Sequence, residues 1–410
     1  RALSLVKTCC STAVRRWPRS SGHDLMARAP ANFSLKDQLF NVETLGQLGR
    51  EYAAVLPALD ANAFTELALA GVADRSLLAC LDWFADCLEP HLARDFPTMA
   101  DQLEAAMTPP LDPSRNDDDF GQFIHAVPGV LAVRHGLEHH RDRALDLLHA
   151  ATQRFSMEFY IRRFLDRWPD STWARLEHWA EDDNYHVRRL VSEGTRPKLP
   201  WAGRIELAPG AAMPLLDRLY ADPTRYVTRS VANHLNDIGK SDPDRVLDAL
   251  ARWRDAGGQA VKELDWMARH SLRTMVKDGH PRALAHLGYD ANAPVDVQVT
   301  LDAPQARIGA ALNFEVTLVA PARTPVVIDY RIRFARPGNR TGEKVFKLKT
   351  TTLAAGTPLT VRKSHKMKAA ATTFELHPGP HMLILQVNGS DRAEVPFDLL
   401  RASLAGTGRG

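Results

Sequence analysis

The stretch YVTRSVANHLNDIG, residues 226–239, carries two side-chain patterns of the same period. Val227, Val231 and Leu235 recur every fourth residue, which predicts an amphipathic helix with its apolar stripe against a core. A polar stripe that begins at Arg229 has the same spacing and is displaced by about two residues, so we expect it on the opposite side. The stretch therefore predicts a helix with one buried and one charged, outward face.

This helix pattern recurs along the chain. HVRRLVSEG (186–194) lies 40 residues earlier, ARHSLRTMVKDG (268–279) follows at an offset of about 41, and FYIRRFLDRW (159–168) comes first, at a shorter interval. A period near 40 residues with two helices per repeat is typical of HEAT-type solenoids, in which neighbouring repeats stack and leave a concave surface for a long ligand. We therefore expect an all-α HEAT-like repeat domain over residues 34–290.

The pattern changes after the helical repeats. Segments such as NFEVTLVA (313–320), VVIDYRIRF (326–334) and HMLILQVNG (381–389) alternate apolar and polar residues, with Pro, Gly and Asn between them. Short strands at this spacing predict an all-β sandwich of the immunoglobulin-like type. We assign it to residues 291–402 and expect a disordered tail at 403–410, so the fold class is multidomain, α followed by β.

The first 33 residues have a different character. They are rich in Arg and Ser, Asp24 is their one acid, and the first residue is not Met. One interpretation is an organellar transit peptide. The other is sequence upstream of a true start at Met26, which we favour because folded-looking sequence begins soon afterwards. In both cases we expect residues 1–33 to be a disordered leader.

The four cysteines fit neither a disulfide framework nor a zinc site. Cys80 and Cys87 stand seven residues apart in an apolar helical stretch, so both are expected to be buried free thiols. This usage indicates a reducing cytosol, and we expect a cytoplasmic protein. The sequence contains no apolar run long enough to span a bilayer, so no membrane partner is expected.

The net charge of +3 is unevenly distributed. Residues 291–410 hold sixteen Lys and Arg against nine Asp and Glu, or +7, and the remainder holds 36 against 40, or −4. Lys347, Lys349 and Lys363 belong to a basic group that we expect on adjacent strands, where it would suit a polyanion. Charged side chains that protect strand edges are an equally good explanation, and both stay open.

Two acids occupy unfavourable positions in the predicted helices. Glu193 and Asp237 fall in the last turn before Gly194 and Gly239, on the predicted outward face, where the helix carries partial negative charge. Gly194 is expected to be a left-handed cap, and Arg189, one turn earlier, is expected to neutralise Glu193. This explains how the carboxylate is tolerated but not why it is there.

Two further residues extend this group. Glu158 lies near a helix start, where the dipole favours an acid and Ser156 can cap. Trp201 ends RPKLPW (196–201), a turn bracketed by prolines. Held near carboxylates, its ring could receive a cationic planar ligand by cation–π contact. It could equally fill the seam between two repeats.

At these residues the chain resembles a known family, the AlkC-type DNA glycosylases of the alkylation-repair superfamily built on HEAT-like repeats. The stretches that carry the resemblance are SLKDQLFN (34–41), TQRFSMEFYIRRFL (152–165), VRRLVSEGTRPKLPW (187–201), YVTRSVANHLNDIGK (226–240) and RHSLRTMVKDG (269–279). The predicted sandwich resembles the immunoglobulin-like domain that many of these proteins carry. Tyr160, Arg163 and Thr228 depart from the family pattern, but every acid is in place.

The resemblance implies a monofunctional DNA glycosylase of base excision repair. It would hydrolyse the N-glycosidic bond of N3-alkylated bases, 3-methyladenine and 3-methylcytosine, and leave an abasic site, without base flipping. The implied catalytic residues are Glu158, Glu193, Asp237 and Trp201, with no metal or cofactor. Such a base is cationic and leaves readily, so the enzyme needs carboxylates for the oxocarbenium-like sugar and for water, not a general acid.

The implied partner is double-stranded DNA containing alkylated bases, bound by a monomer at the bacterial nucleoid. The residues expected to contact DNA are Arg162, Arg163, Arg188, Arg189, Arg196, Lys198, Arg229, Asn233, Arg273, Lys347, Lys349 and Lys363. The alternative is a non-catalytic HEAT-repeat scaffold that binds nucleic acid or protein. A pure scaffold would be expected to have basic residues where this chain has acids, which favours the enzyme. The sequence does not rank the two alkylated bases.

Overall fold

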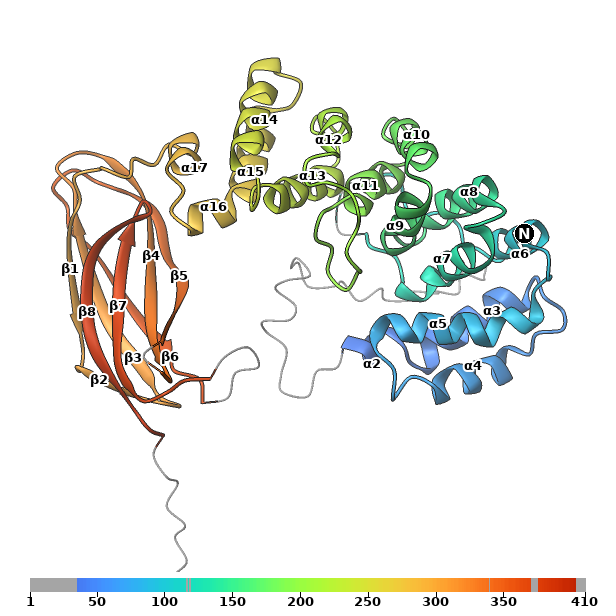
Figure 1. Cartoon of the computed structure of the whole chain (residues 1–410), viewed down its shortest axis with the longest axis horizontal. Helices are drawn as coiled ribbons and strands as arrows, with labels where there is room; N and C mark the ends of the chain where they lie inside the picture. The colour runs from blue at the N-terminus through green and yellow to red at the C-terminus, as the bar shows by residue number, and fades with distance from the viewer. Residues whose placement is uncertain (1–34, 116, 118, 339, 370–374, 403–410) are drawn as a thin grey trace, which may run out of the picture. The chain divides into compact units, whose positions relative to one another are not determined.

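A computed structural model describes residues 35–115, 117, 119–338, 340–369 and 375–402 (Figure 1). The predicted leader and tail lie outside these residues. The chain divides into two compact units. The first comprises the described residues up to Thr172 together with Asp183–Leu190, and the second comprises Trp173–Asp182 together with the described residues from Val191 onward.

The first unit is built from helices. In chain order they are α2 (Leu35–Leu39), α3 (Val42–Ala53), α4 (Ala61–Ala70), α5 (Leu77–Leu88), η1 (Glu89–His91), α6 (Phe96–Ala105), η2 (Phe123–Ala126), α7 (Val127–Leu131), η3 (Ala132–Gly136), α8 (Arg141–Thr152) and α9 (Glu158–Arg167). Polar caps fix several starts: Asn41 accepts from two amides of α3, and Asp60 does the same for α4. Cys80 and Cys87 are buried free thiols on α5, as predicted.

The helices of the second unit occur in pairs. Helices α10 (Pro169–Trp179) and α11 (Tyr185–Gly194) contain residues of both units. They are followed by α12 (Met213–Leu219), α13 (Arg225–Ile238), α14 (Pro243–Ala256), α15 (Val261–Ser271), α16 (Arg273–Lys277) and α17 (Pro281–His286). Because α13 begins 40 residues after α11, the predicted two-helix repeat is confirmed. None of the described helices is long and apolar enough to cross a bilayer.

Helix α13 is buried on more than its apolar stripe. Val227, Val231 and Leu235 are fully buried, as predicted. The polar side was expected to face outward, and this is wrong for Asp237, which is 7% exposed. The reason is that α13 packs against α12, α14 and α15, so neighbours cover most of its circumference. Only a narrow stripe, which includes Arg229, stays partly open to solvent.

The end of α11 differs from the prediction. Gly194 is the last residue of the helix and is not left-handed. Instead the hydroxyl of Thr195 donates to the carbonyls of Val191 and Ser192, at 2.7 and 3.2 Å. Because a side chain satisfies these terminal carbonyls, the helix does not need a left-handed glycine to end.

The β-part is a sandwich of two sheets, which confirms the predicted fold class. Its strands are β1 (Asp296–Leu301), β2 (Gln305–Arg307), β3 (Ala311–Val319), β4 (Thr324–Arg336), β5 (Arg340–Leu353), β6 (Leu359–Lys366), β7 (Gly379–Val387) and β8 (Ser390–Leu400). One sheet has the order β1-β3-β6 and the other β2-β8-β7-β4-β5. A continuous apolar core lies between them, in which the rings of Phe314 and Tyr330 meet edge to face with centroids 5.1 Å apart.

A two-residue turn connects β7 to β8. It also binds the segment that precedes β1. Asn388 and Gly389 both have positive φ, at 51° and 79°, as a type I′ hairpin requires. The side-chain amide of Asn388 donates to the carbonyls of Asp290 and Pro325, at 2.8 and 3.2 Å. The segment that leads from the helices into β1 is therefore fastened to the sandwich. The division at residue 290 itself stays a prediction.

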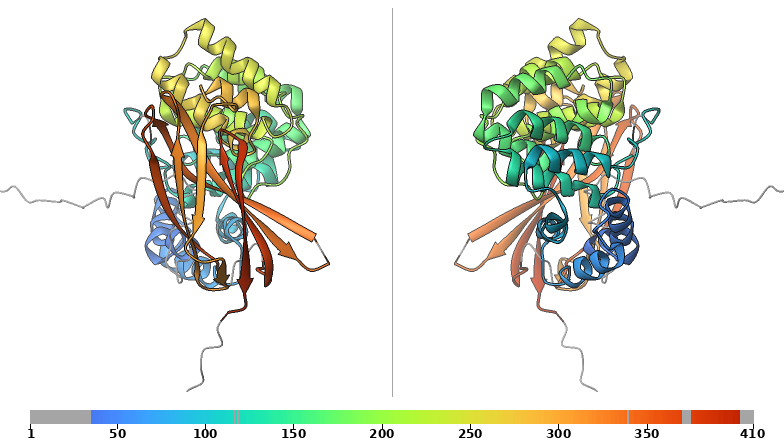
Figure 2. Two further views of the ribbon diagram at one scale, coloured as in Figure 1. Left: turned by 90° about the vertical axis from the view of Figure 1, so that its left-hand side faces the viewer. Right: turned by 90° about the vertical axis from the view of Figure 1, so that its right-hand side faces the viewer.

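Lys347, Lys349 and Lys363 were expected on adjacent strands, but the strands that carry them belong to different sheets. Lys347 and Lys349 lie on β5, at the edge of the five-stranded sheet, and Lys363 lies on β6, at the edge of the three-stranded sheet. The two edges approach through side chains, since the rings of Phe346 and His365 are 4.5 Å apart. Figure 2 shows the β4–β5 hairpin, in orange, continuing past its neighbours.

The first testable consequence concerns the core stripe of α13. Leu235→Ala should destabilise the protein by about 2–5 kcal/mol, because it removes apolar contacts and leaves a cavity in a fully buried position. Val261→Ala is the matched control, since Val261 is 69% exposed and its truncation should change stability by less than about 0.5 kcal/mol. Denaturant unfolding of the full chain measures both, and equal losses would contradict this packing.

Candidate functional site

Glu193 and Asp237 meet around the side chain of Arg196. The guanidinium donates from Nη1 to Oε1 of Glu193 at 2.5 Å. It also donates from Nε and Nη2 to Oδ2 of Asp237, at 3.0 and 2.8 Å. One arginine thus joins the last turn of α11 to the last turn of α13, and the fixed fork of a guanidinium suits this bridging. We call these three residues the arginine-bridged acids.

The arginine-bridged acids are buried. Side-chain exposure is 7% for Glu193, 4% for Asp237 and 10% for Arg196. Burial works against the charged form of Arg196, but the two carboxylates outweigh it and hold its pKa above the ordinary value. Charges buried in this way are stable only when paired and hydrogen-bonded, so the three side chains depend on one another.

Further donors complete the group. Ser230 donates to Oε2 of Glu193 at 2.6 Å, and Ser230 also contacts the hydroxyl of Ser192 at 2.9 Å. Lys240 donates to Oδ1 of Asp237 at 2.8 Å, and its side chain is 43% exposed. Every carboxylate oxygen of the pair therefore has a donor. Of the two cations, Arg196 is enclosed and Lys240 is the looser partner.

This arrangement explains how two acids tolerate the negative ends of their helices. A carboxylate in the last turn is disfavoured by roughly 0.3–1 kcal/mol on dipole grounds. A buried charge-assisted pair with Arg196 more than offsets this, since such hydrogen bonds contribute about 1.5–3 kcal/mol each. Arg189, the predicted partner of Glu193, donates to Ser156 and to Glu158.

His234 lies beside the arginine-bridged acids and is fully buried. Burial, reinforced by Arg196, lowers the pKa of His234 to about 4, so the ring is neutral at pH 7. Its Nδ1 lies 3.0 Å from the carbonyl oxygen of Ser192 and therefore carries the proton. The ring ties α13 to α11 without adding charge next to the two carboxylates.

Glu158 has its own cation in the first unit. It begins α9, where the helix dipole favours an acid. Arg189 donates to its Oε2 at 2.7 Å, and Ser156 donates to the same oxygen at 2.8 Å. Ser156 was predicted to cap the helix, and this is wrong, because Met157 occupies the N-cap position and Ser156 bonds the carboxylate instead.

Trp201 is exposed, at 53% of its surface. Its φ of 62° lies in the left-handed region, which costs a residue with a side chain roughly 1–2 kcal/mol. Within the described part of the chain the indole has no hydrogen-bond, ring or cation–π partner. Of the two alternatives left open for Trp201, the seam between repeats is wrong, because a seam residue would be buried. The ring is held outward and available.

The predicted DNA-binding residues differ in exposure. Two are buried, which corrects their assignment to the DNA surface: as whole residues, Arg162 is 3% exposed and Arg196 is 8% exposed, and Arg196 is bound by acids. Asn233 and Arg273 are in contact with each other. The remaining positions are at least partly open to solvent, namely Arg163, Arg188, Arg189, Lys198, Arg229, Lys347, Lys349 and Lys363.

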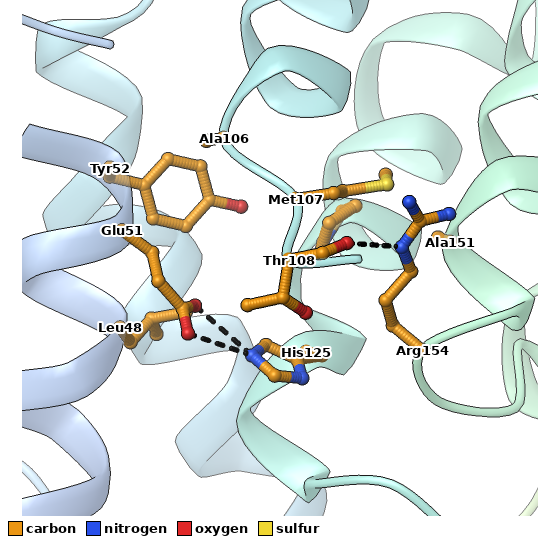
Figure 3. Close-up of a pocket in the computed structure, with 10 residues that line it drawn as sticks. Leu48, Glu51, Tyr52, Ala106, Met107, Thr108, His125, Ala151 and Arg154 are labelled. Atoms are coloured by element: carbon orange, nitrogen blue, oxygen red, sulfur yellow. Dashed lines mark hydrogen bonds and ion pairs between the residues drawn. The ribbon is translucent and has the colours of Figure 1, made fainter. Parts of the chain in front are cut away.

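A separate pocket lies in the first unit (Figure 3). Its space of about 290 Å³, open solvent included, is lined by residues of α3, α8 and η2, among others. His125 contacts both carboxylate oxygens of Glu51, and Arg154 donates to the carbonyl of Thr108. Its charged groups are thus engaged with one another or with the backbone. None of the predicted site residues lines it.

Sequence reasoning missed the cations that belong to the acids. Arg196 follows Glu193 by three residues, and Lys240 follows Asp237 by three residues. This shared acid-x-x-base spacing places each cation next to its acid, just past the helix end. The spacing was the available signal for the pairing. No sequence signal indicates that Arg196 also reaches the second acid, 41 residues away.

A charge-removal variant tests the bridging role of Arg196. Arg196→Met should destabilise the protein by roughly 3–5 kcal/mol, because two buried carboxylates lose their common cation. Adding Asp237→Asn to Arg196→Met should recover part of this loss, since one of the stranded charges is then removed. Lys240→Met, at the exposed partner, should cost no more than about 1 kcal/mol. Equal losses for Arg196→Met and Lys240→Met in urea unfolding would refute the bridging role.

The sequence profile of the family described as uncharacterised protein YhaZ, C-terminal Ig-like domain, matches residues 296–401. The uncharacterized protein YhaZ of Bacillus subtilis is 28% identical over 370 residues, which cover 88% of this chain and 98% of that protein.

A solved structure is similar over nearly the whole length. It is the alkylpurine DNA glycosylase AlkC of Pseudomonas fluorescens, bound to DNA containing an abasic site analog. The two chains are 33% identical, with a TM-score of 0.77, and the similarity covers 90% of this chain and all of the other. The likeness therefore includes both the helical repeats and the sandwich.

Proposed function

This chain belongs to the AlkC family of DNA glycosylases, and we propose that it hydrolyses the N-glycosidic bond of N3-alkylated bases in double-stranded DNA. The bases are 3-methyladenine and 3-methylcytosine, and the product is an abasic site in base excision repair. The enzyme acts in the bacterial cytoplasm as a monomer, is monofunctional, needs no metal or cofactor and does not flip the base. The observation that carries the proposal is the pair of buried carboxylates at the ends of α11 and α13.

The reaction suits carboxylates. An N3-alkylated base carries a positive charge, so when the C1′–N bond breaks, the electron pair neutralises the departing base and the sugar becomes oxocarbenium-like. A carboxylate in a low-dielectric setting stabilises that cation more strongly than one in water. Water then adds to C1′ and passes its proton to a carboxylate, so no general acid is needed.

Asp237 is the better placed acid for this role. At rest the charges of Glu193 and Asp237 are balanced by Arg196 and Lys240. Lys240 holds one oxygen of Asp237 from a half-exposed position, so an arriving cation can replace it at low cost. Arg196 keeps the other oxygen and thereby the orientation of the carboxylate. We assign Oδ1 of Asp237 to the sugar cation, Glu193 to its support and Glu158 to a contributing role.

Exposed side chains complete the proposed contacts with DNA. Trp201 offers its ring to the cationic base, which cation–π attraction favours by roughly 0.5–2 kcal/mol. Open cations such as Arg163, Lys198 and Lys349 neutralise phosphates, and the affinity should therefore fall with salt. These contacts position the duplex, whereas the alkylated base is recognised by its charge.

One observation favours a second candidate, a non-catalytic scaffold. The arginine-bridged acids are fully hydrogen-bonded, as a purely structural ion-pair cluster would be. In that case the acids would contribute to stability alone. The two candidates differ in whether removal of one carboxylate charge abolishes base release or only lowers stability.

The decisive assay is release of methylated bases from alkylated duplex DNA, resolved by chromatography under single-turnover conditions. Asp237→Asn should lower the rate by at least about 100-fold, since one preorganised charge commonly contributes 10²–10³. DNA affinity should stay the same or rise, because a negative charge near phosphates is lost. Asp244→Asn is the control, since Asp244 is 66% exposed and pairs with Arg282 on the surface. A wild-type rate of base release by Asp237→Asn would refute the catalytic role of Asp237. If the wild type itself releases no methylated base, the non-catalytic scaffold is favoured.

Trp201 gives a second, independent prediction. Trp201→Ala should slow base release while changing stability by less than about 0.5 kcal/mol, because the side chain is mostly exposed. Trp201→Phe keeps an aromatic face and should retain most of the rate. The comparison needs excision rates and melting temperatures for the same preparations. A loss of stability without a loss of rate would return Trp201 to a structural role.

A further inference from the structure

Arg273, at the start of α16, is a partly buried cation without a carboxylate. Its Nη1 donates to the carbonyl of His270, and its Nη2 donates to Oδ1 of Asn233 at 2.9 Å. Both acceptors are neutral, and among the described residues no carboxylate forms an ion pair with it. Burial, together with the nearby Arg196, lowers the pKa of Arg273. Its charge is therefore poorly compensated in the DNA-free protein.

Several other arginines on the helices of the second unit are paired with acids. Arg225 is bound through two nitrogens by Glu263, and Arg254 contacts Asp265 at 2.7 Å. The contrast makes Arg273 unusual, because a desolvated guanidinium is ordinarily matched by an acid. An anion from outside the protein would supply what Arg273 lacks.

His270, on α15, presents a second polar atom at the same place. Its Nε2 lies 2.9 Å from Oδ1 of Asn233, an acceptor, so Nε2 carries the proton and Nδ1 of the neutral ring is left with a lone pair. In the described part of the chain Nδ1 has no hydrogen-bond partner and is not among the enclosed polar atoms, so it faces solvent. Asn233 thus joins the side chains of His270 and Arg273.

The imidazole is fixed in orientation by its other neighbours. Its ring stacks on Trp266 with centroids 4.9 Å apart and an angle of 11°. The guanidinium of Arg225 lies 3.9 Å from the Trp266 ring centroid and is held by Glu263. Because Trp266 already stacks with two side chains, it is poorly placed to stack on a base. The surface here suits a nucleic-acid backbone better.

The groups around His270 are predominantly positive. Arg225 and Arg229 approach from α13, Arg196 from the segment after α11, and Arg273 from α16. Two of these arginines are themselves bound by acids: Glu263 contacts Arg225, and Asp237, which Lys240 also contacts, binds Arg196. Burial and these four arginines lower the pKa of His270 to about 4, so it is neutral at pH 7.

We propose that Asn233, His270 and Arg273 form a phosphodiester-binding site in which His270 gains a proton when a DNA phosphate binds. Arg273 donates to one phosphate oxygen. A proton from solvent adds to Nδ1 of His270, which then donates to another oxygen. A phosphodiester is permanently anionic and has no proton of its own to give, so the proton must come from solvent. This inference rests on the proposed function only in that the anion belongs to DNA.

The sign of the pH dependence follows from this linkage. The bound phosphate offsets the arginines and moves the pKa of His270 up from about 4 toward its ordinary value. Between these two values the complex binds more protons than the free protein, so affinity rises as pH falls. If the ordinary value of about 6.5 is restored, affinity should be about tenfold higher at pH 5.5 than at pH 7.5.

The experiment compares the full chain with two histidine variants. Binding of a fluorescein-labelled duplex is measured by anisotropy from pH 5.5 to 7.5 at constant ionic strength. His270→Gln retains a donor toward Asn233 but does not titrate, so it should lose the tenfold change with pH. His286→Gln is the control, because burial lowers the pKa of His286 too, with Arg254 and Asp265 as its charged neighbours. It should keep the wild-type pH dependence.

Proton uptake can also be measured directly. Calorimetric titration at pH 6 in buffers of different ionisation enthalpy should show uptake of up to about one proton by the wild type and less by His270→Gln. Arg273→Gln should weaken binding at every pH and flatten the slope of log K against log salt by about one unit. Identical pH profiles for the wild type and His270→Gln, or equal proton uptake, would overturn the proposal.

The excision assay separates this inference from the proposed function. If the chain releases methylated bases but the wild type and His270→Gln bind DNA with identical pH profiles, only the proposed role of His270 is refuted. If DNA binding takes up a proton but no methylated base is released, the proposed phosphate site is supported and the proposed enzymatic function is refuted.

Discussion

The interaction on which the site depends is the contact of Arg196 with Glu193 and Asp237. Each acid stands at the negative end of a helix and is almost fully buried, two conditions that separately oppose its charge. One guanidinium satisfies both acids at once because its fork offers donors in two directions. Since Glu193 belongs to α11 and Asp237 to α13, the same contact also sets how these two helix ends meet.

The fold was largely accessible from the sequence. The four-residue spacing of Val227, Val231 and Leu235 identified the buried face of α13, because a helical period reports directly on burial. The alternating segments quoted from the sequence correspond to β3, β4 and β7 for the same reason. Strand β8 was missed although Asn388-Gly389 is a strong hairpin signal, and β2 is too short, at three residues, to show a period.

The site was accessible only in part. Glu193 and Asp237 could be singled out because each conflicts with the dipole of its own helix, a local property. The burial of Glu193 and Asp237 could not be predicted in this way, because a helical wheel places the polar stripe in solvent by default. In a stack of repeats the neighbouring helices cover part of that stripe as well. The bridge through Arg196 depends on the spacing between two helices, and no local pattern encodes it.

Arginines in the helical part divide into two classes by their partners. Those such as Arg225, held by Glu263, have their charge balanced within the protein, so they add little to the attraction of a polyanion. Arg273 contacts only neutral acceptors, so its positive charge is not balanced by these contacts. A balance of −4 for the residues before 291 is therefore a poor guide to DNA binding.

What a phosphate meets is the local surplus of unmatched cations, not the sum over the domain. The same reasoning applies to the acids. Glu193 and Asp237 are matched by Arg196 and Lys240 in the DNA-free protein, so the site is close to neutral at rest. It becomes negative only when the exposed Lys240 moves away. In the proposed reaction such a site would not repel the backbone as DNA approaches, and it would present a carboxylate where a cation replaces the lysine. The exposure difference between Arg196 and Lys240, 10% against 43%, thus separates the cation that orients Asp237 from the one that can leave it.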